Sequence, residues 1–337
     1  MIIFYTNIVI SLLMFPVLLA NDKYLKRISA EILFFYFLLI IFFQSGSPDF
    51  FSYQQIYAGL YKRKIEFLYT SVCLFLSNVL NIGFKAFWII QGIVMVVLLR
   101  KLVFAFSENI LLSLILFMNI YLPLKMLTQV RNFIAVELFF IACLMYMNNK
   151  KIYLPIFIIS VNTHISTGLG IVSFFRRQNI LLFLTFCSIF FLFMPISKIL
   201  PIDFISTIIP ESFRYYLEWL TKYNTMGKTL FHISRFIILL IFSIVFLNRF
   251  ESRNSIIFSM FMIAFIVKFA FSQFGEMALR LSDTFMISEI FLFSNISFRF
   301  KNNSKYFFYF MVISYSIIML FLTKKNFPNL FPSFFSS

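Results

Sequence analysis

Apolar runs of about 17–25 residues, each long enough to cross a bilayer as a helix, recur along this chain from one end to the other. Of its 337 residues, 61% are hydrophobic, and the mean hydropathy is +0.92. A water-soluble domain of this length could not bury so much apolar surface, because the buried share of the surface rises slowly with size. The runs lack strict alternation, which argues against a β-barrel. The sequence therefore predicts an all-α integral membrane protein, a polytopic bundle of about ten transmembrane helices in a single domain over residues 1–337.

The first apolar run, residues 1–20, has no basic segment before it and no cleavage site of small residues after it. Both features are expected of a secretory signal peptide. We therefore expect this run to remain in the protein as a membrane span.

Basic residues in short connections set the expected orientation. The net charge is +16, which in a soluble protein would suggest nucleic acid, but here the positive-inside rule accounts for much of it. The expected partner of these charges is the lipid bilayer, not nucleic acid. The basic clusters that we place in the cytoplasm are Lys23 with Lys26 and Arg27, Arg100-Lys101, Lys150-Lys151, Arg176-Arg177, Arg249 with Arg253, and Arg299 with Lys301 and Lys305. The main outer loops are then residues 45–66 and 197–232, and both termini lie outside.

This orientation requires two segments that do not cross the membrane. Residues 67–82 are interrupted by Ser77, Asn78 and Asn81 and end at Gly83, so we predict a half-buried helix on the outer face directly after Glu66. The second segment, residues 152–175, is flanked by basic pairs at both ends. Its centre, Asn162-Thr163-His164-Ile165-Ser166, is a polar break. Irregular backbone at membrane depth survives only where protein or a wet cavity surrounds it, so we predict a re-entrant pair of half-helices there.

Charged and polar groups within or next to spans are the candidate functional residues, because such groups are costly in a membrane. Arg131 opens a helix on the outer face, a position that by itself favours an interfacial anchor. His164 lies at the polar break, where it could line a cavity or be a satisfied core residue. Arg280 could pair locally with Glu276 or Asp283, or it could bind an anion. Glu137 lies within a span and must be paired or protonated.

Cations are about as abundant on the predicted outer side as on the cytoplasmic side, against the usual bias. This abundance suggests an anionic substrate, and a diphosphate suits the planar donors of arginine. The outer loops carry Asp49, Tyr53, Glu66 and Arg214, although loops this polar are normally just solvated. Cys73, Cys143 and Cys187 are isolated in apolar runs and read as buried small hydrophobes. We find no metal-binding or disulfide spacing and expect no cofactor.

Three segments together resemble the EpsG-type polysaccharide polymerases, relatives of the Wzy O-antigen polymerases. They are Pro48-Asp49-Phe50-Phe51-Ser52-Tyr53 with the trailing Glu66, Gln129-Val130-Arg131-Asn132-Phe133-Ile134-Ala135, and Asn162-Thr163-His164-Ile165-Ser166. A weaker fourth element is Arg280 followed by Phe285. Asn132 stands where that family usually has Gln, and Phe285 where it usually has Tyr. The resemblance covers residues from about 45 to 290 in the order of the family's pattern.

The resemblance implies a glycosyltransferase on the periplasmic face of the bacterial inner membrane. It would join oligosaccharide repeat units, both donor and acceptor carried on undecaprenyl diphosphate, into O-antigen or a related surface polysaccharide without a metal. A chain-length regulator and a flippase of the same pathway are further expected partners. The resemblance implies binding of diphosphate or sugar by Arg131, Arg280, Tyr53 and Arg214, and catalytic roles for Asp49, Glu66 and His164. Asp49 or Glu66 would be the base.

Two other functions fit part of the pattern. A flippase or transporter of lipid-linked oligosaccharides would also need charged groups in a cavity, but transporters usually show internal repeats with paired broken helices, and this sequence shows one break and no repeat. A membrane acyltransferase would typically rely on a histidine in a more polar bundle, a role for which His164 is the candidate.

Overall fold

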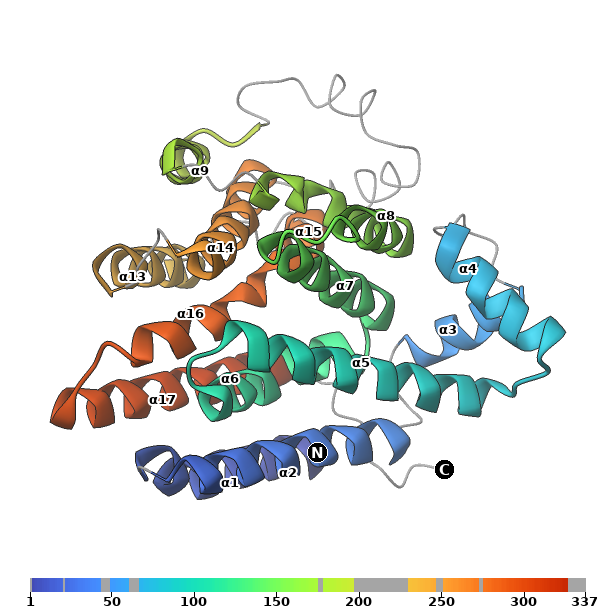
Figure 1. Cartoon of the computed structure of the whole chain (residues 1–337), viewed down its shortest axis with the longest axis horizontal. Helices are drawn as coiled ribbons and strands as arrows, with labels where there is room; N and C mark the ends of the chain where they lie inside the picture. Colours follow the sequence, from blue (N-terminus) through green and yellow to red (C-terminus); the bar gives the residue numbers. More distant parts are fainter. Residues whose placement is uncertain are drawn as a thin grey trace. The chain divides into compact units, whose positions relative to one another are not determined.

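The computed structural model describes residues 2–20, 22–43, 49–60, 67–174, 178–196, 230–246, 251–272 and 275–326. All regular secondary structure in this part of the chain is helical, and it contains no strand (Figure 1). The α-helices are α1 (Ile2–Leu19), α2 (Lys23–Phe43), α3 (Phe50–Tyr57), α4 (Phe67–Leu74), α5 (Phe84–Phe106), α6 (Ile110–Leu116), α7 (Val130–Met147), α8 (Tyr153–Thr163), α9 (Gln178–Phe193), α13 (Leu230–Phe246), α14 (Ser252–Ala270), α15 (Gly275–Met286), α16 (Ser288–Ser297) and α17 (Asn302–Asn326). Two π-helical segments, η1 (Phe75–Val79) and η2 (Phe117–Met126), and a 3₁₀ segment, η3 (Ile165–Phe174), complete the set. The predicted all-α class is confirmed for these residues.

Among the described residues, five helices are long and apolar enough to cross a membrane: Ile2–Leu19, Phe84–Phe106, Val130–Met147, Ser252–Ala270 and Asn303–Asn326. Several further apolar helices are shorter, between 10 and 17 residues. A bilayer core needs about 20 helical residues to cross. The membrane class is therefore supported, whereas the predicted count of about ten spans is not confirmed.

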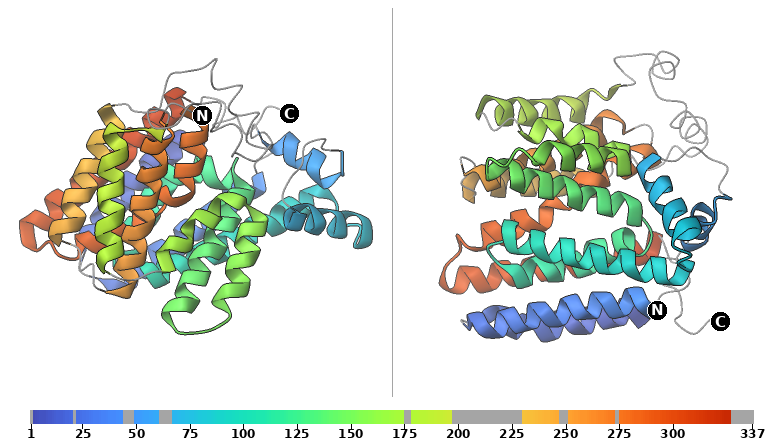
Figure 2. Two further views of the ribbon diagram at one scale, coloured as in Figure 1. Left: turned by 90° about the horizontal axis from the view of Figure 1, so that it is seen from above. Right: turned by 45° about the vertical axis from the view of Figure 1, so that its right-hand side comes forward.

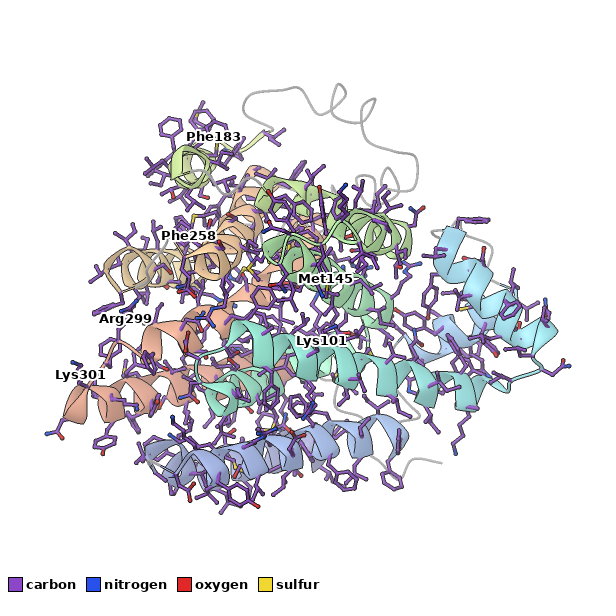
Figure 3. The ribbon with its side chains drawn as sticks, in the orientation of Figure 1. Lys101, Met145, Phe183, Phe258, Arg299 and Lys301 are labelled. Atoms are coloured by element: carbon purple, nitrogen blue, oxygen red, sulfur yellow. The ribbon has the colours of Figure 1, made fainter. Side chains whose placement is uncertain are left out.

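Apolar side chains cover the outside of these helices as well as the inside. Phe258 of α14 is fully buried, whereas Phe183 of α9 is 63% exposed. Both side chains are labelled in Figure 3. Many other large apolar side chains of α1, α5, α9 and α17 are exposed in the same way. Such a surface is stable in lipid, where an exposed Phe or Leu costs nothing.

The chain forms two compact units. One comprises Met1–Met145, Lys150–Ile165 and Phe293–Ser337, and the other comprises Tyr146–Asn149 and Ser166–Leu292. The single membrane domain expected from the sequence stays a prediction.

In the first unit, α2 packs against α1, α5 and α6, and α17 packs against η2, α6 and α1. Gly92 of α5 allows close approach of α2, because a Cβ at this position would clash with Ile41 Cγ2. Buried amides join the helices: Asn119 Nδ2 of η2 donates to Ser11 Oγ of α1 and to Ser316 Oγ of α17, each at 2.9 Å. Small residues and interhelical hydrogen bonds are the usual means of helix association in lipid.

In the second unit, α14 lies between α9 and α15. Figure 2 shows α9 and α14 side by side. Phe236 of α13 packs its ring against three rings of α14, at Phe261, Phe265 and Phe269, with centroids 4.8–6.3 Å apart. An aromatic core of this kind is what the Phe-rich runs of the sequence form when they pack.

Both interruptions that the sequence predicted are present. Helix α4 with η1 covers residues 67–79, buries Tyr69 and Cys73, and exposes Phe67 and Phe75. The turn that follows uses Asn81 at φ 50, a left-handed conformation that asparagine tolerates. At the second interruption α8 ends at Thr163, His164 is extended, and the 3₁₀ segment η3 begins at Ile165. The placement of the first helix on the outer face, and the return of the chain at the second, stay predictions.

Candidate functional site

The start of α7 is the centre of the candidate site. It follows the π-helical segment η2, which contains Pro123 and ends at Met126. Proline lacks an N–H group and clashes with the carbonyl one turn earlier, so it disturbs regular α-helical bonding. After η2 the Gln129 N–H donates a hydrogen bond to the Leu124 carbonyl at 2.9 Å, and α7 begins at Val130. Two consecutive polar residues, Arg131 and Asn132, therefore occupy the first turn of a long apolar helix.

Lys125 is a buried cation beside this helix start. Only 1% of the residue is exposed. Its Nζ donates to Gln129 Oε1 at 2.7 Å and to Asn132 Oδ1 at 2.9 Å. Both acceptors are neutral amides, and these two bonds hold the ammonium in place. This lysine was not predicted from the sequence as a site residue.

His164 belongs to the same group of side chains. It is the C-cap residue that follows α8, and its backbone N–H donates to the Ser160 carbonyl at 3.0 Å. The hydroxyl of Ser160 in turn donates to the Ala135 carbonyl of α7 at 2.7 Å. These bonds hold the end of α8 against α7 and bring His164 Nδ1 to 3.4 Å from Asn132 Nδ2. The helix break predicted from the sequence therefore places His164 beside the start of α7.

Arg131 is half-buried and lies on an aromatic platform. Its backbone N–H donates to the Tyr53 hydroxyl at 3.2 Å, and its guanidinium carbon lies 5.9 Å from the centroid of the Tyr69 ring. The Tyr69 hydroxyl accepts a bond from Gln91 Nε2 at 2.8 Å. The Tyr53 ring lies 6.1 Å from the Tyr69 ring and 5.8 Å from Trp88, between centroids. Cation–π contact of this kind orients a guanidinium without neutralising it.

Asp49 is the described carboxylate closest in sequence to this platform. It is the N-cap residue of α3, its side chain makes no capping hydrogen bond, and it is partly exposed. The Asp49 carbonyl accepts the Tyr53 N–H at 2.9 Å, so one helical turn separates the carboxylate from the tyrosine that contacts Arg131. Glu66 and Arg214 lie outside the described residues.

The structure thus brings together Tyr53, Arg131 and His164 in the first unit. Arg280 belongs to the second unit, on α15, where it is exposed, and Phe285 of the same helix is buried. No group of three or more metal-ligating side chains occurs among the described residues. Lys125, Tyr69 and Gln91 were missed, although a lysine two residues after a proline between two apolar runs is a signal that could have found the first of them.

A second buried charged cluster was also missed, in the second unit. Arg235 of α13 forms an ion pair with Glu289 of α16, and their side chains are 7% and 0% exposed. Lys268 of α14 is 2% exposed and interacts electrostatically with Asp283 and with both members of the pair. Two cations and two carboxylates balance in this cluster, as expected of groups that stabilise a helix bundle in lipid.

The comparisons with known proteins agree with this picture of a membrane protein. The model of the EpsG family matches residues 27–332, nearly the whole chain. No curated protein and no solved structure matches the sequence. The match includes Asp49, Tyr53, Arg131, His164 and Arg280 within its bounds. The chain belongs to the EpsG family, which is related to the Wzy-like polymerases.

Proposed function

We propose that this protein is a membrane glycosyltransferase that polymerises oligosaccharide repeat units carried on undecaprenyl diphosphate. The reaction takes place on the periplasmic face of the bacterial inner membrane, and its product is O-antigen or a related surface polysaccharide. The family indicates a polymerase-like function in membrane polysaccharide biosynthesis. The substrate, the reaction and the face of the membrane are the proposal.

The single observation that carries this proposal is the set of groups at the start of α7. A half-buried arginine on an aromatic platform, a buried lysine held by neutral amides, and a histidine lie on elements packed together. A cationic site of this kind recognises a multiply charged anion, and arginine offers a planar set of donors that matches phosphate oxygens. The aromatic rings beside it provide flat surfaces of the kind that stack on sugars.

In the proposed reaction, an acceptor hydroxyl on the non-reducing sugar of one repeat unit attacks the anomeric carbon of the growing chain. The bond between that carbon and the diphosphate oxygen breaks, and undecaprenyl diphosphate leaves with the bonding electron pair. The Asp49 carboxylate takes the proton of the hydroxyl as general base. Arg131 binds the diphosphate as its charge increases.

The remaining assignments are extensions of the same proposal. Glu66 is the alternative base, and Arg280 and Arg214 are further candidates for the diphosphate or the sugar. The donor and acceptor lipids reach the site from the bilayer. A chain-length regulator and a flippase of the pathway are the proposed protein partners.

The test uses the purified protein in vesicles that contain lipid-linked repeat units and no other enzyme. We expect a ladder of products that differ by one repeat unit, and one released undecaprenyl diphosphate for each bond formed. Arg131→Ala protein at the same density in the vesicles is the matched control and should give no ladder. Movement of the lipid-linked unit across the bilayer without bond formation would instead identify a flippase and reject the proposal.

Cells without the gene provide an independent check. Loss of a polymerase leaves surface glycolipid that carries a single repeat unit, because the units are still exported. Loss of a flippase leaves none. A single repeat unit is the expected result, and surface glycolipid of normal length would contradict the proposal.

A further inference from the structure

Three side chains form a chain of polar contacts from η2 to the break after α8. Lys125 Nζ lies 2.9 Å from Asn132 Oδ1, and Asn132 Nδ2 lies 3.4 Å from His164 Nδ1. We infer that Lys125 and Asn132 are positioning residues that hold His164 in the tautomer with its proton on Nε2, so that His164 donates a hydrogen bond to the diphosphate leaving group. The hydrogen bond from His164 to the diphosphate rests on the proposed function, whereas the assignment of the tautomer does not.

Which group donates and which accepts in each of these contacts follows from the hydrogen-bonding capacity of the three side chains. An ammonium group has three donors and no acceptor, so the atom of Asn132 that faces Lys125 must be the amide oxygen. The amide NH₂ then faces away from the lysine, toward the imidazole. An amide NH₂ can only donate, so His164 Nδ1 must accept. In a neutral imidazole the other nitrogen, Nε2, then carries the proton.

The reverse orientation of the amide is unfavourable. It would direct the NH₂ of Asn132 at the ammonium of Lys125, two donors facing each other in a site where Lys125 is 1% and Asn132 is 6% exposed. The bond from Lys125 to Gln129 at 2.7 Å keeps the ammonium from turning away. The histidine is held from the other side, because Ser160 fixes the end of α8 to the Ala135 carbonyl. Burial makes each of these polar constraints stronger than it would be in water.

The tautomer decides what His164 does in the proposed reaction. A second proton, on Nδ1, would face the NH₂ of Asn132, so two donors would be directed at each other. A neutral imidazole with Nε2–H stabilises developing negative charge by donation. A carboxylate must then remove the proton of the attacking sugar hydroxyl, which is consistent with the proposed role of Asp49.

The first test is a spectroscopic measurement of the tautomer. The chain has only two histidines, so His232→Gln protein labelled with ¹⁵N-histidine reports on His164 alone. Solid-state NMR of this protein in bilayers near neutral pH should show a protonated Nε2 and an unprotonated Nδ1 that accepts a hydrogen bond. A protonated Nδ1 would overturn the inference without further variants.

Substitutions at two positions test whether Asn132 and Lys125 determine the tautomer of His164. Asn132→Asp places a carboxylate, which only accepts, beside Nδ1, and it should move the proton from Nε2 to Nδ1. Lys125→Met removes the donor that fixes the amide and should give a mixture of the two tautomers, whereas Lys125→Arg keeps a donor and should resemble the parent. The exposed Lys101→Met is the matched control. Unchanged spectra from both Asn132→Asp and Lys125→Met would show that these residues do not set the tautomer.

The second test concerns the reaction. The side-chain amide nitrogen of glutamine can occupy the place of Nε2, and that of asparagine the place of Nδ1. Removal of one donor to a developing oxyanion typically costs about 10²–10³-fold in rate, so His164→Asn should lose that much polymerisation while His164→Gln retains most of it. Equal rates for the two variants, with Nε2–H present in the spectrum, would overturn the donor role alone. Failure of the unmodified protein to form polymer would reject the proposed function and leave the tautomer standing.

Discussion

The hydroxyl of Tyr53 accepts a hydrogen bond from the backbone N–H of Arg131 at 3.2 Å, so α3 is tied directly to the first turn of α7. The first N–H groups of a helix have no partner within the helix. A side chain 78 residues away in sequence satisfies one of them here. The same contact places the ring of Tyr53 next to the arginine that we propose binds the diphosphate.

Tyr53→Phe removes this acceptor and keeps the ring. We expect a loss of about 1 kcal/mol in stability, the usual net value of one hydrogen bond, and a further loss of polymerisation rate because the start of α7 is less well held. Thermal unfolding in detergent and the rate in vesicles measure the two effects. Tyr57→Phe is the matched control, because Tyr57 is similarly buried and its hydroxyl donates to the Ile82 carbonyl at 2.6 Å. Equal rate losses in both variants would show that the effect is not specific to α7.

Substitutions of Arg131 separate charge from geometry. Lysine keeps the charge but has no planar array of donors, so Arg131→Lys should be impaired and Arg131→Ala nearly inactive, with normal amounts of protein in the membrane. The measurement is the ladder of products made in vesicles. Arg100→Ala is the control, since Arg100 forms a half-exposed ion pair with Glu31 on α2. Normal chain extension by Arg131→Ala would mean that Arg131 is only an interfacial anchor.

Loss of one partner of the buried pair between Arg235 and Glu289 should strongly destabilise the second unit. Removal of one partner from a buried pair typically costs about 3–5 kcal/mol, because the other charge stays buried. We therefore expect Glu289→Leu to lower the unfolding temperature far more than the double variant Arg235→Leu/Glu289→Leu. Glu31→Gln, in the exposed pair with Arg100, should cost less than about 1 kcal/mol. A double variant as unstable as the single one would reject this account.

Local signals in the sequence predicted part of this structure, and long-range packing determines the rest. The break at His164 and the short helix after Glu66 were predictable, because polar residues within an apolar run have a local effect on helix formation. Arg131 was found for a similar reason, as a charge at the start of an apolar run. The burial of Lys125 was not predictable, because it depends on the packing of neighbouring elements around the junction of η2 and α7, where its ammonium contacts the amides of Gln129 and Asn132.

The predicted count of about ten spans is not confirmed, for a related reason. A hydropathy pattern measures the length of an apolar run, but π-helical and 3₁₀ segments divide several runs into shorter helices. The run that contains α6 and η2 changes its helical type at Phe117. The run of α8 and η3 changes at His164. The change at Phe117 lies within an apolar stretch, so composition alone counts that run as one continuous span, whereas the polar residues around His164 marked the second change in the sequence.

The orientation of the chain is directly testable. We predict that Arg100-Lys101, Lys150-Lys151 and Arg176-Arg177 all lie in the cytoplasm. In a variant without Cys73, Cys143 and Cys187, a cysteine at Asn179 should resist a membrane-impermeant reagent added from outside. A cysteine at the exposed Gln54 of α3 should be labelled under the same conditions. Ready labelling at position 179 would contradict the re-entrant arrangement.

The identity of the base is the last prediction. Asp49 and Glu66 are the two carboxylates that we predict to lie outside and that the resemblance in sequence pointed to, and we favour Asp49. The Asp49 side chain makes no capping hydrogen bond to α3, whereas its backbone carbonyl is bonded to the Tyr53 N–H at 2.9 Å. The carboxylate is therefore not used to cap the helix, although its backbone is fixed one turn from the residue that contacts Arg131. Glu66 directly precedes α4, where a carboxylate stabilises a helix start electrostatically.

General-base catalysis typically contributes about 10²–10⁴-fold. Asp49→Asn should therefore lower the polymerisation rate by that order, with little change in stability and with donor binding largely intact. Glu66→Gln, its matched control, should cost much less in rate and act mainly through stability. The comparison is made in vesicles with equal amounts of each protein, and binding of the donor lipid is measured separately from bond formation. Equal or reversed effects of the two substitutions would remove Asp49 from the assignment. Full rates from both variants would mean that neither carboxylate takes the proton, and the acidic residues of the loop 197–232 would then be the remaining outer candidates.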